Sequence, residues 1–123
     1  YVENDSLVLK KFSNFIDKEK LSNIAASLAE SINMPVAIVV SSDVVATARI
    51  SSMIASEVKI PNNISVMKPF VVDNEAGYKN IIIAPAVNIS GVNIYVLAFN
   101  KEKSDLNDEL ISVGLIAKIL STL

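Results

Sequence analysis

Two apolar runs near the C-terminal end constrain the fold more than any other feature of the sequence. They lie in the stretch NIIIAPAVNISGVNIYVLAF at positions 80–99, where Ile81–Ile83 and Val92–Ala98 flank a polar link that contains Gly91. Runs rich in Ile and Val on either side of a turn predict a β-hairpin, here over Tyr78–Val87 and Gly91–Phe99. Pro85 lacks a backbone N–H, so it predicts either an edge position or a bulge in the first of these strands.

Further strands are predicted upstream of this hairpin. Val36–Val40 is a continuous apolar run, which is typical of a strand that is buried on both faces. Ser41, Ser42 and Asp43 have the composition of a turn, so Val44–Ala48 is expected to return as the second strand of another hairpin. Ile64–Val72 is strand-like but contains Pro69, which again predicts an edge or a bulge.

Helices are predicted at both ends and between the two hairpins. Asp5 or Ser6 can cap a first helix, and Asp17 can cap a second helix that continues to about Asn33, before Pro35. Whether these two helices fuse into one stays open, because Ser13 and Asn14 suit a break. The remaining predicted helices are a short one over Ile50–Val58 and a closing one capped by Ser104 or Asp105.

The closing helix has more apolar surface than one sheet can cover. One face carries Leu106, Leu110, Val113, Ala117 and Leu120, and a second stripe carries Ile111, Leu115 and Ile119. In the predicted first helix, Leu9, Phe12 and Ile16 also fall at helical spacing. A homodimer through Leu9, Phe12, Ile16, Ile111, Leu115 and Ile119 would cover this excess, while packing within the monomer is the alternative.

Composition narrows the class of protein. The 123 residues suit a single domain, and about half of them are apolar, which excludes a disordered chain. The net charge is −2 with scattered cations, so we expect no direct nucleic-acid binding by this segment. No apolar run approaches the length of a membrane helix, so we expect no membrane partner, and the absence of Cys favours a cytoplasmic setting. The chain opens at Tyr1, which suggests a fragment of a longer regulator.

The residue types give little support to catalysis. The chain has neither His nor Cys, so a nucleophilic Ser would have to rely on Lys or a carboxylate as its base. The acid pairs Asp17/Glu19, Asp73/Glu75 and Asp108/Glu109 fall at helix starts or turns, where capping and the helix dipole explain them. We therefore expect no enzyme activity, no catalytic residues, no metal site and no cofactor.

The element order and two sequence stretches resemble the GAF-like regulatory domains of the profilin-like superfold. The stretches are MPVAIVVSSDVVATA and IIIAPAVNISGVNIYVLAFNKEKSDLNDELISVGLIAKIL, in which Pro85, Gly91 and the acidic pair Asp108–Glu109 match the pattern. Within the family, the chain is most similar to the stage V sporulation protein T type, where the GAF part follows an AbrB-type DNA-binding domain. The likeness spans about Lys18 to Leu120, but the stretch between Arg49 and Pro69 is short for a GAF domain.

The resemblance implies an α+β fold, with about five antiparallel strands and the N- and C-terminal helices packed on one face. It implies one domain over 1–123, with a leading helix at 1–16 and a core at 17–123. It also implies a dimerising transcriptional or signalling regulator that senses a small molecule. The rival family is roadblock, whose domains act as scaffolds without a metabolite, but they usually have a long helix where Ile50–Val58 lies.

A ligand pocket is expected between the sheet and the segment Ile50–Met67. Arg49 is the only Arg in the chain and follows the second strand, where its planar fork can clamp a carboxylate or a phosphate. A solvated surface role is the alternative for Arg49, and core packing is the alternative for the sheet tyrosines. The candidate ligand-binding residues are Arg49, Ser51, Lys68, Tyr78 and Tyr95.

Overall fold

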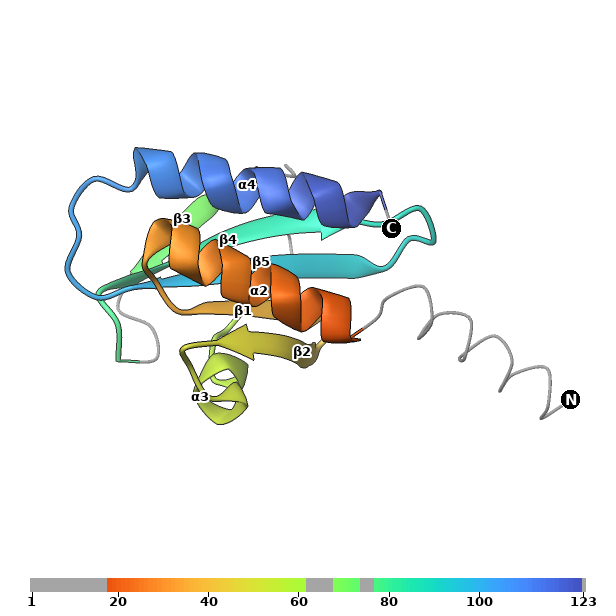
Figure 1. The fold of residues 1–123 in the computed structure, drawn as a ribbon, viewed down its shortest axis with the longest axis horizontal. Helices are drawn as coiled ribbons and strands as arrows, with labels where there is room; N and C mark the ends of the chain where they lie inside the picture. The colour runs from red at the N-terminus through yellow and green to blue at the C-terminus, as the bar shows by residue number, and fades with distance from the viewer. Residues whose placement is uncertain (1–17, 62–67, 74–76, 123) are drawn as a thin grey trace, which may run out of the picture.

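A five-stranded antiparallel sheet organises the computed structural model, which describes residues 18–61, 68–73 and 77–122 (Figure 1). The strand order is β2-β1-β5-β4-β3, and two long helices and one short helix complete the described part. The predicted α+β class with about five antiparallel strands is therefore confirmed. The elements are α2 (Lys18–Ile32), β1 (Val36–Val40), β2 (Asp43–Ala48), α3 (Ser52–Ser56), β3 (Phe70–Asp73), β4 (Asn80–Val87), β5 (Asn93–Asn100) and α4 (Asn107–Ser121).

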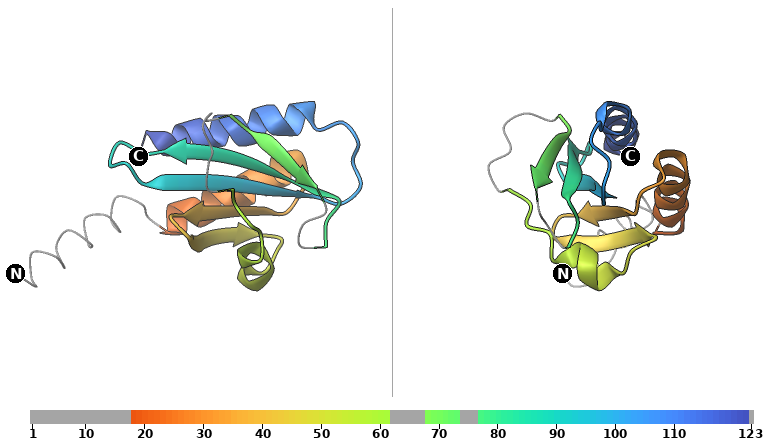
Figure 2. Two further views of the ribbon diagram at one scale, coloured as in Figure 1. Left: turned by 180° about the vertical axis from the view of Figure 1, so that it is seen from behind. Right: turned by 90° about the vertical axis from the view of Figure 1, so that its left-hand side faces the viewer.

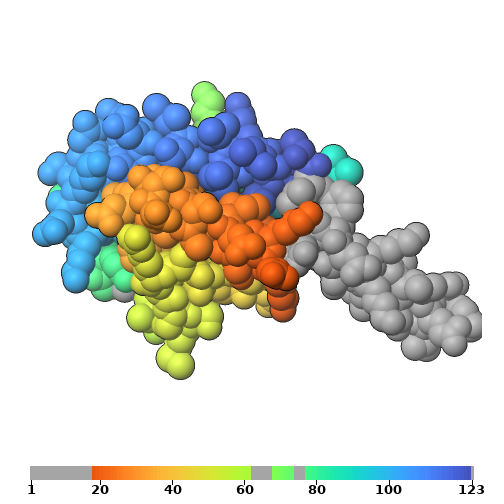
Figure 3. Space-filling model, in the orientation of Figure 1, coloured from red at the N-terminus to blue at the C-terminus, as the bar shows by residue number. Residues whose placement is uncertain are grey.

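The helices α2 and α4 lie side by side (Figure 3), and both cross one face of the sheet (Figure 1). Side chains alternate between the faces of a strand, so Ile38 of β1 and Val96 of β5 point into this helix-covered layer. The buried face of α4 is the one predicted, because Val113, Ala117 and Leu120 are all buried. The expected packing of both long helices on one face is thus confirmed (Figure 2).

The opposite face of the sheet has a smaller apolar cluster. Ala37, Leu97 and Phe99 pack there with Ala55 of α3 and with Val58, which follows α3. Because both faces are covered at the centre of the sheet, all five residues of β1 are buried, as its continuous apolar run predicts.

Pro69 and Pro85 lie next to positions at which the pairing of β3 with β4 stops. Pro69 directly precedes β3, which is an edge strand. The described residues of β3 pair only with Asn80–Ile83 of β4, so Pro85 lies in a part of β4 that β3 does not reach. The edge prediction is therefore correct for Pro69 and wrong for the strand that contains Pro85, because β4 lies between β5 and β3. Pro85 pairs with Tyr95 in an uninterrupted β4–β5 register, so the alternative of a bulge is wrong as well. A register shift occurs instead in the β1–β2 pairing, between Ile38 and Val39.

The start of α4 corrects one prediction. The helix begins at Asn107 after Leu106, which makes no side-chain cap, so neither Ser104 nor Asp105 is the N-cap residue. Asp105 instead accepts a hydrogen bond from the Asn107 backbone N–H at 3.0 Å. The predicted helix over 1–16, and Asp17 as the cap of α2, lie outside the described residues. The predicted stop of α2 near Asn33 is confirmed, since Asn33 adopts the left-handed conformation with φ 56°.

A polar cluster fixes the loop between β5 and α4. The buried Asn100 donates to Asn80 Oδ1 at 2.6 Å and to the Lys103 carbonyl at 2.7 Å, and it accepts from the Lys103 backbone N–H. The Lys103 ammonium pairs with Glu109, whose side chain is almost fully buried in the first turn of α4. The hydrogen bond to Glu109 raises the pKa of Lys103, desolvation opposes this, and the charges of Glu109, Asp108 and Asp105 add to it.

We expect Glu109→Gln to lower the Lys103 pKa toward its ordinary value near 10.4, because the substitution removes the principal stabiliser of the ammonium. A lysine whose pKa is higher in the folded than in the unfolded chain stabilises the fold at pH values below its unfolded-state pKa. This stabilisation is lost as the pH rises through the folded-state pKa. NMR titration of the lysine side chains measures the change. Glu102→Gln, an exposed acid of the same loop, should leave the Lys103 pKa unchanged, whereas an unchanged pKa in Glu109→Gln would contradict the pairing.

Gly114 allows α4 to approach Pro69 closely. A Cβ atom added at Gly114 would lie 2.6 Å from Pro69 Cγ, and the proline ring cannot retreat without moving the chain that leads into β3. We expect Gly114→Ala to destabilise the domain by about 1 kcal/mol, since a crowding cost of about 1–3 kcal/mol exceeds the roughly 1 kcal/mol gain in helix propensity.

Urea denaturation compares this variant with Ser112→Ala, a matched control in the same helix. The control should be neutral or slightly stabilising, because Ala has the higher helix propensity. A Gly114→Ala variant more stable than the wild-type chain would show that Pro69 does not restrict this position.

Candidate functional site

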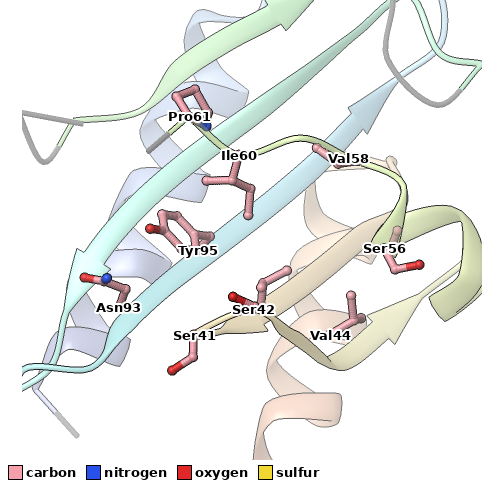
Figure 4. Close-up of a pocket in the computed structure, with 11 residues that line it drawn as sticks. Ser41, Ser42, Val44, Ser56, Val58, Ile60, Pro61, Asn93 and Tyr95 are labelled. Atoms are coloured by element: carbon pink, nitrogen blue, oxygen red, sulfur yellow. The ribbon is translucent and has the colours of Figure 1, made fainter. Parts of the chain in front are cut away.

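A cavity of about 440 Å³ opens on the sheet face opposite α2 and α4, between the strands and the segment that follows α3 (Figure 4). Its floor is a row of side chains across three neighbouring strands, because Val39 of β1 is aligned with Val44 of β2 and with Tyr95 of β5. The segment from Val58 to Pro61 crosses above these strands, and the Ile60 side chain points down toward the sheet (Figure 4). The volume is within the range typical of small-molecule sites.

Hydroxyl and amide groups surround this apolar floor. They belong to Ser41 and Ser42 of the β1–β2 turn, Ser56 of α3, and Asn93 and Tyr95 of β5. The Ser41 backbone N–H donates to the Asn93 carbonyl at 2.8 Å, so the turn is tied to the start of β5 at the rim of the cavity. Ser41 adopts a positive φ of 60° at the first of the two turn residues, as a tight hairpin turn requires.

None of the described residues that line the cavity carries a charged side chain. Asp43, Glu57 and Lys59 are next to lining residues in the sequence, but they are exposed and do not line it. A net charge on a bound molecule would therefore lose its hydration here without gaining an opposite charge from the described lining. The arrangement favours uncharged polar groups.

Of the five predicted ligand-binding residues, Tyr95 lines the cavity and the other four do not. Arg49 directly follows the C-terminal end of β2, whereas the Ser41–Ser42 turn precedes the other end of this strand. The Arg49 Nη1 donates to Asn33 Oδ1 at 2.9 Å. This contact ties the end of β2 to the end of α2. Arg49 has a positive φ of 63°.

The other three candidates have different surroundings. Ser51 caps α3, because its hydroxyl accepts from the Ile54 backbone N–H at 3.2 Å. Tyr78 lies against Phe99 with ring centroids 5.1 Å apart. Lys68 borders a separate groove beside α4. The role of Arg49, Ser51, Lys68 and Tyr78 in binding a ligand stays a prediction.

Four polar residues of the cavity were not singled out from the sequence as ligand-binding candidates, namely Ser41, Ser42, Ser56 and Asn93. Asn93 and Tyr95 are two positions apart in one strand, so their spacing is a usable signal that they share a face. The serines carry no such signal, because Ser41 and Ser42 read as turn residues and Ser56 comes near only through the placement of α3.

The predicted outer stripe of α4 is exposed in the described chain. Ile111, Leu115 and Ile119 are 70%, 57% and 48% exposed, although all three are large and apolar. The other predicted dimer residues, Leu9, Phe12 and Ile16, lie outside the described residues. Whether these six residues form a dimer interface stays a prediction.

Over 18–61, 68–73 and 77–122, no three acidic side chains are grouped closely enough to hold a metal ion. In the same part of the chain, no helix is both long and apolar enough to cross a membrane.

Comparisons with known proteins leave the family open. No family model matches the sequence, and no significant match was found among curated proteins or solved structures. The described fold, a five-stranded antiparallel sheet with helices, is compatible with a GAF-like domain.

Proposed function

We propose that this chain is a GAF-like regulatory domain that binds a small, uncharged, polar molecule in the cavity between β1, β2, β5 and α3. The observation that carries the proposal is the cavity itself, with its row of Val44, Val39 and Tyr95 and its surrounding hydroxyl and amide groups. Most of the accessible surface of this cavity is polar, so hydrogen bonds would supply most of the recognition of a bound molecule.

The chemistry of the lining selects the ligand class. Serine hydroxyls, the Asn93 amide and the Tyr95 hydroxyl can each donate and accept hydrogen bonds. A ligand with hydroxyl or amide groups and a small apolar surface matches them, with the apolar part against Val39 and Ile60.

The short α3 supports a GAF-like domain over a roadblock domain. Among the described residues between β2 and β3, the helix has five residues, whereas roadblock domains usually have a long helix there. A short helix followed by a crossing segment leaves room for a cavity on this face of the sheet. A scaffold that binds protein partners and no metabolite remains the second candidate, and the exposed Ile111, Leu115 and Ile119 favour it.

The proposed role is regulatory and non-enzymatic. The described residues of the lining include no His, Cys, acid or base, so they offer no group to activate a nucleophile or to shuttle a proton near neutral pH. Ligand binding would instead favour one arrangement of α3 and the segment after it, because both contribute to the lining. In this proposal the domain acts in the cytoplasm and reports ligand occupancy to an attached transcriptional or signalling domain.

A ligand-observed NMR screen of uncharged polyols, sugars and primary amides tests the proposal. We expect at least one binder whose amide-shift perturbations in the protein centre on Ser42, Ser56 and Tyr95. Ser56→Phe should weaken that binding at least tenfold, because the ring occupies the cavity from an exposed position on α3.

Ser52→Phe is the matched control, since it places the same ring on the same helix at a residue that does not line the cavity. It should bind the compound as tightly as the wild-type chain. Binding that survives Ser56→Phe, or a screen without a compound that maps to the cavity, would contradict the sensory function and favour the scaffold.

A further inference from the structure

A second concavity, of about 710 Å³, runs along the outer side of α4 on the other face of the sheet. It exists because β3 pairs only with Asn80–Ile83, which leaves the last part of β4 beside α4 without a covering strand among the described residues. Small residues, including Ala84, Ala86 and Gly114, leave space along this groove, and Pro69, Ile111 and Leu115 also contribute to its lining.

The groove is apolar and poorly covered. Ile111 and Leu115 stand on the same side of α4 one turn apart, and both are more than half exposed. Leaving such side chains in water forgoes the free energy of burying them, so a matching apolar element would be stabilised here. The groove follows α4 from Leu110 to Ser121, a length of about 17 Å at the rise of an α-helix.

The sequence before α2 has the chemistry to fill this groove. Leu9, Phe12 and Ile16 recur at helical spacing, with Val8 and Phe15 beside them, and the polar residues fall between. Ten residues from Leu7 to Ile16 would span about 15 Å as a helix, close to the length of the groove. Large apolar side chains would complement a groove whose lining includes alanines and a glycine.

We propose that residues 7–16 of a second copy of this chain occupy the groove beside α4, and that two copies exchange these segments reciprocally. The proposal concerns the face of the sheet opposite the small-molecule cavity, so it does not depend on the proposed ligand. Reciprocal exchange gives a closed twofold dimer in which both grooves are filled by the same contact.

The reach of the chain favours a second copy over the segment of the same chain. The helix α2 packs on β1 and β2, whereas the groove lies beyond α4 on the β4 side, so the two are separated by α4 (Figure 2). At the usual spacing of packed helices, the path from Lys18 across α4 is about 20 Å. An extended chain covers this with about six residues, which are 12–17. Phe12 and Ile16 would then be part of the extended connection, and only the apolar residues before them could dock into the groove of the same chain.

The test uses the full 123-residue chain and single cysteines, since the natural sequence has none. Chains with Phe12→Cys and chains with Leu115→Cys are mixed at micromolar concentration, left to exchange subunits and oxidised mildly. We expect a covalent heterodimer that joins the two variants, and little disulfide-linked product from either variant alone. The same Phe12→Cys chain mixed with Ile89→Cys, an exposed apolar position outside the groove, should remain uncoupled.

Sedimentation equilibrium supplies the independent readout. The wild-type chain should be a dimer at micromolar concentration, and Leu115→Glu and Phe12→Glu should each raise the dimer dissociation constant at least tenfold while circular dichroism stays unchanged. Ile89→Glu should sediment as the wild type does.

Three outcomes would overturn the proposal. One is a wild-type monomer. Another is covalent coupling of Leu115→Cys only to itself, which would indicate α4 paired with α4. The third concerns a chain that carries Phe12→Cys and Leu115→Cys together: an internal disulfide in its monomer would place the segment in its own groove.

Discussion

The pairing of β5 with both β1 and β4 is the constraint on which the rest of the structure depends. Residues Val96–Phe99 of β5 are buried from both faces, and each contributes to one of the two apolar clusters. The register with β1 aligns Val39 with Tyr95, and the register with β4 aligns Pro85 with the same Tyr95. A one-residue slip would move Tyr95 to the helix-covered face and remove the floor of the cavity.

The two faces of this sheet serve different ends. The helix face supplies most of the buried apolar surface, through α2 and α4, and it gives the domain its stability. Among the described residues, the opposite face is covered by the short α3 and the segment after it, and space remains over Val39, Val44 and Tyr95. The proposed functions follow this division, with a small molecule on the lightly covered face and a second copy beside α4 on the other.

Much of the fold could be predicted from local patterns, because each pattern had one structural outcome. The uninterrupted run Val36–Val40 could be satisfied only by burial on both faces, and Pro69 and Pro85 could be tolerated only where pairing stops. The start of α4 could not be predicted, since Asp105 has the chemistry of a cap and bonds to the N–H of Asn107, but the N-cap position is occupied by Leu106. The site was harder still. Arg49 has the chemistry of an anion clamp, yet its side chain bonds to Asn33, sixteen positions away. Ser56 and Ser42 line the same cavity because α3 packs against the sheet, and no local sequence pattern predicts this packing.

Native mass spectrometry can detect an uncharged small molecule held in the cavity over β1, β2 and β5. The purified chain is incubated with a metabolite extract, desalted and measured under gentle ionisation. We expect an additional mass that corresponds to a small neutral compound and that disappears on denaturation. A spectrum with only the bare protein mass, at metabolite concentrations in the millimolar range, would contradict it.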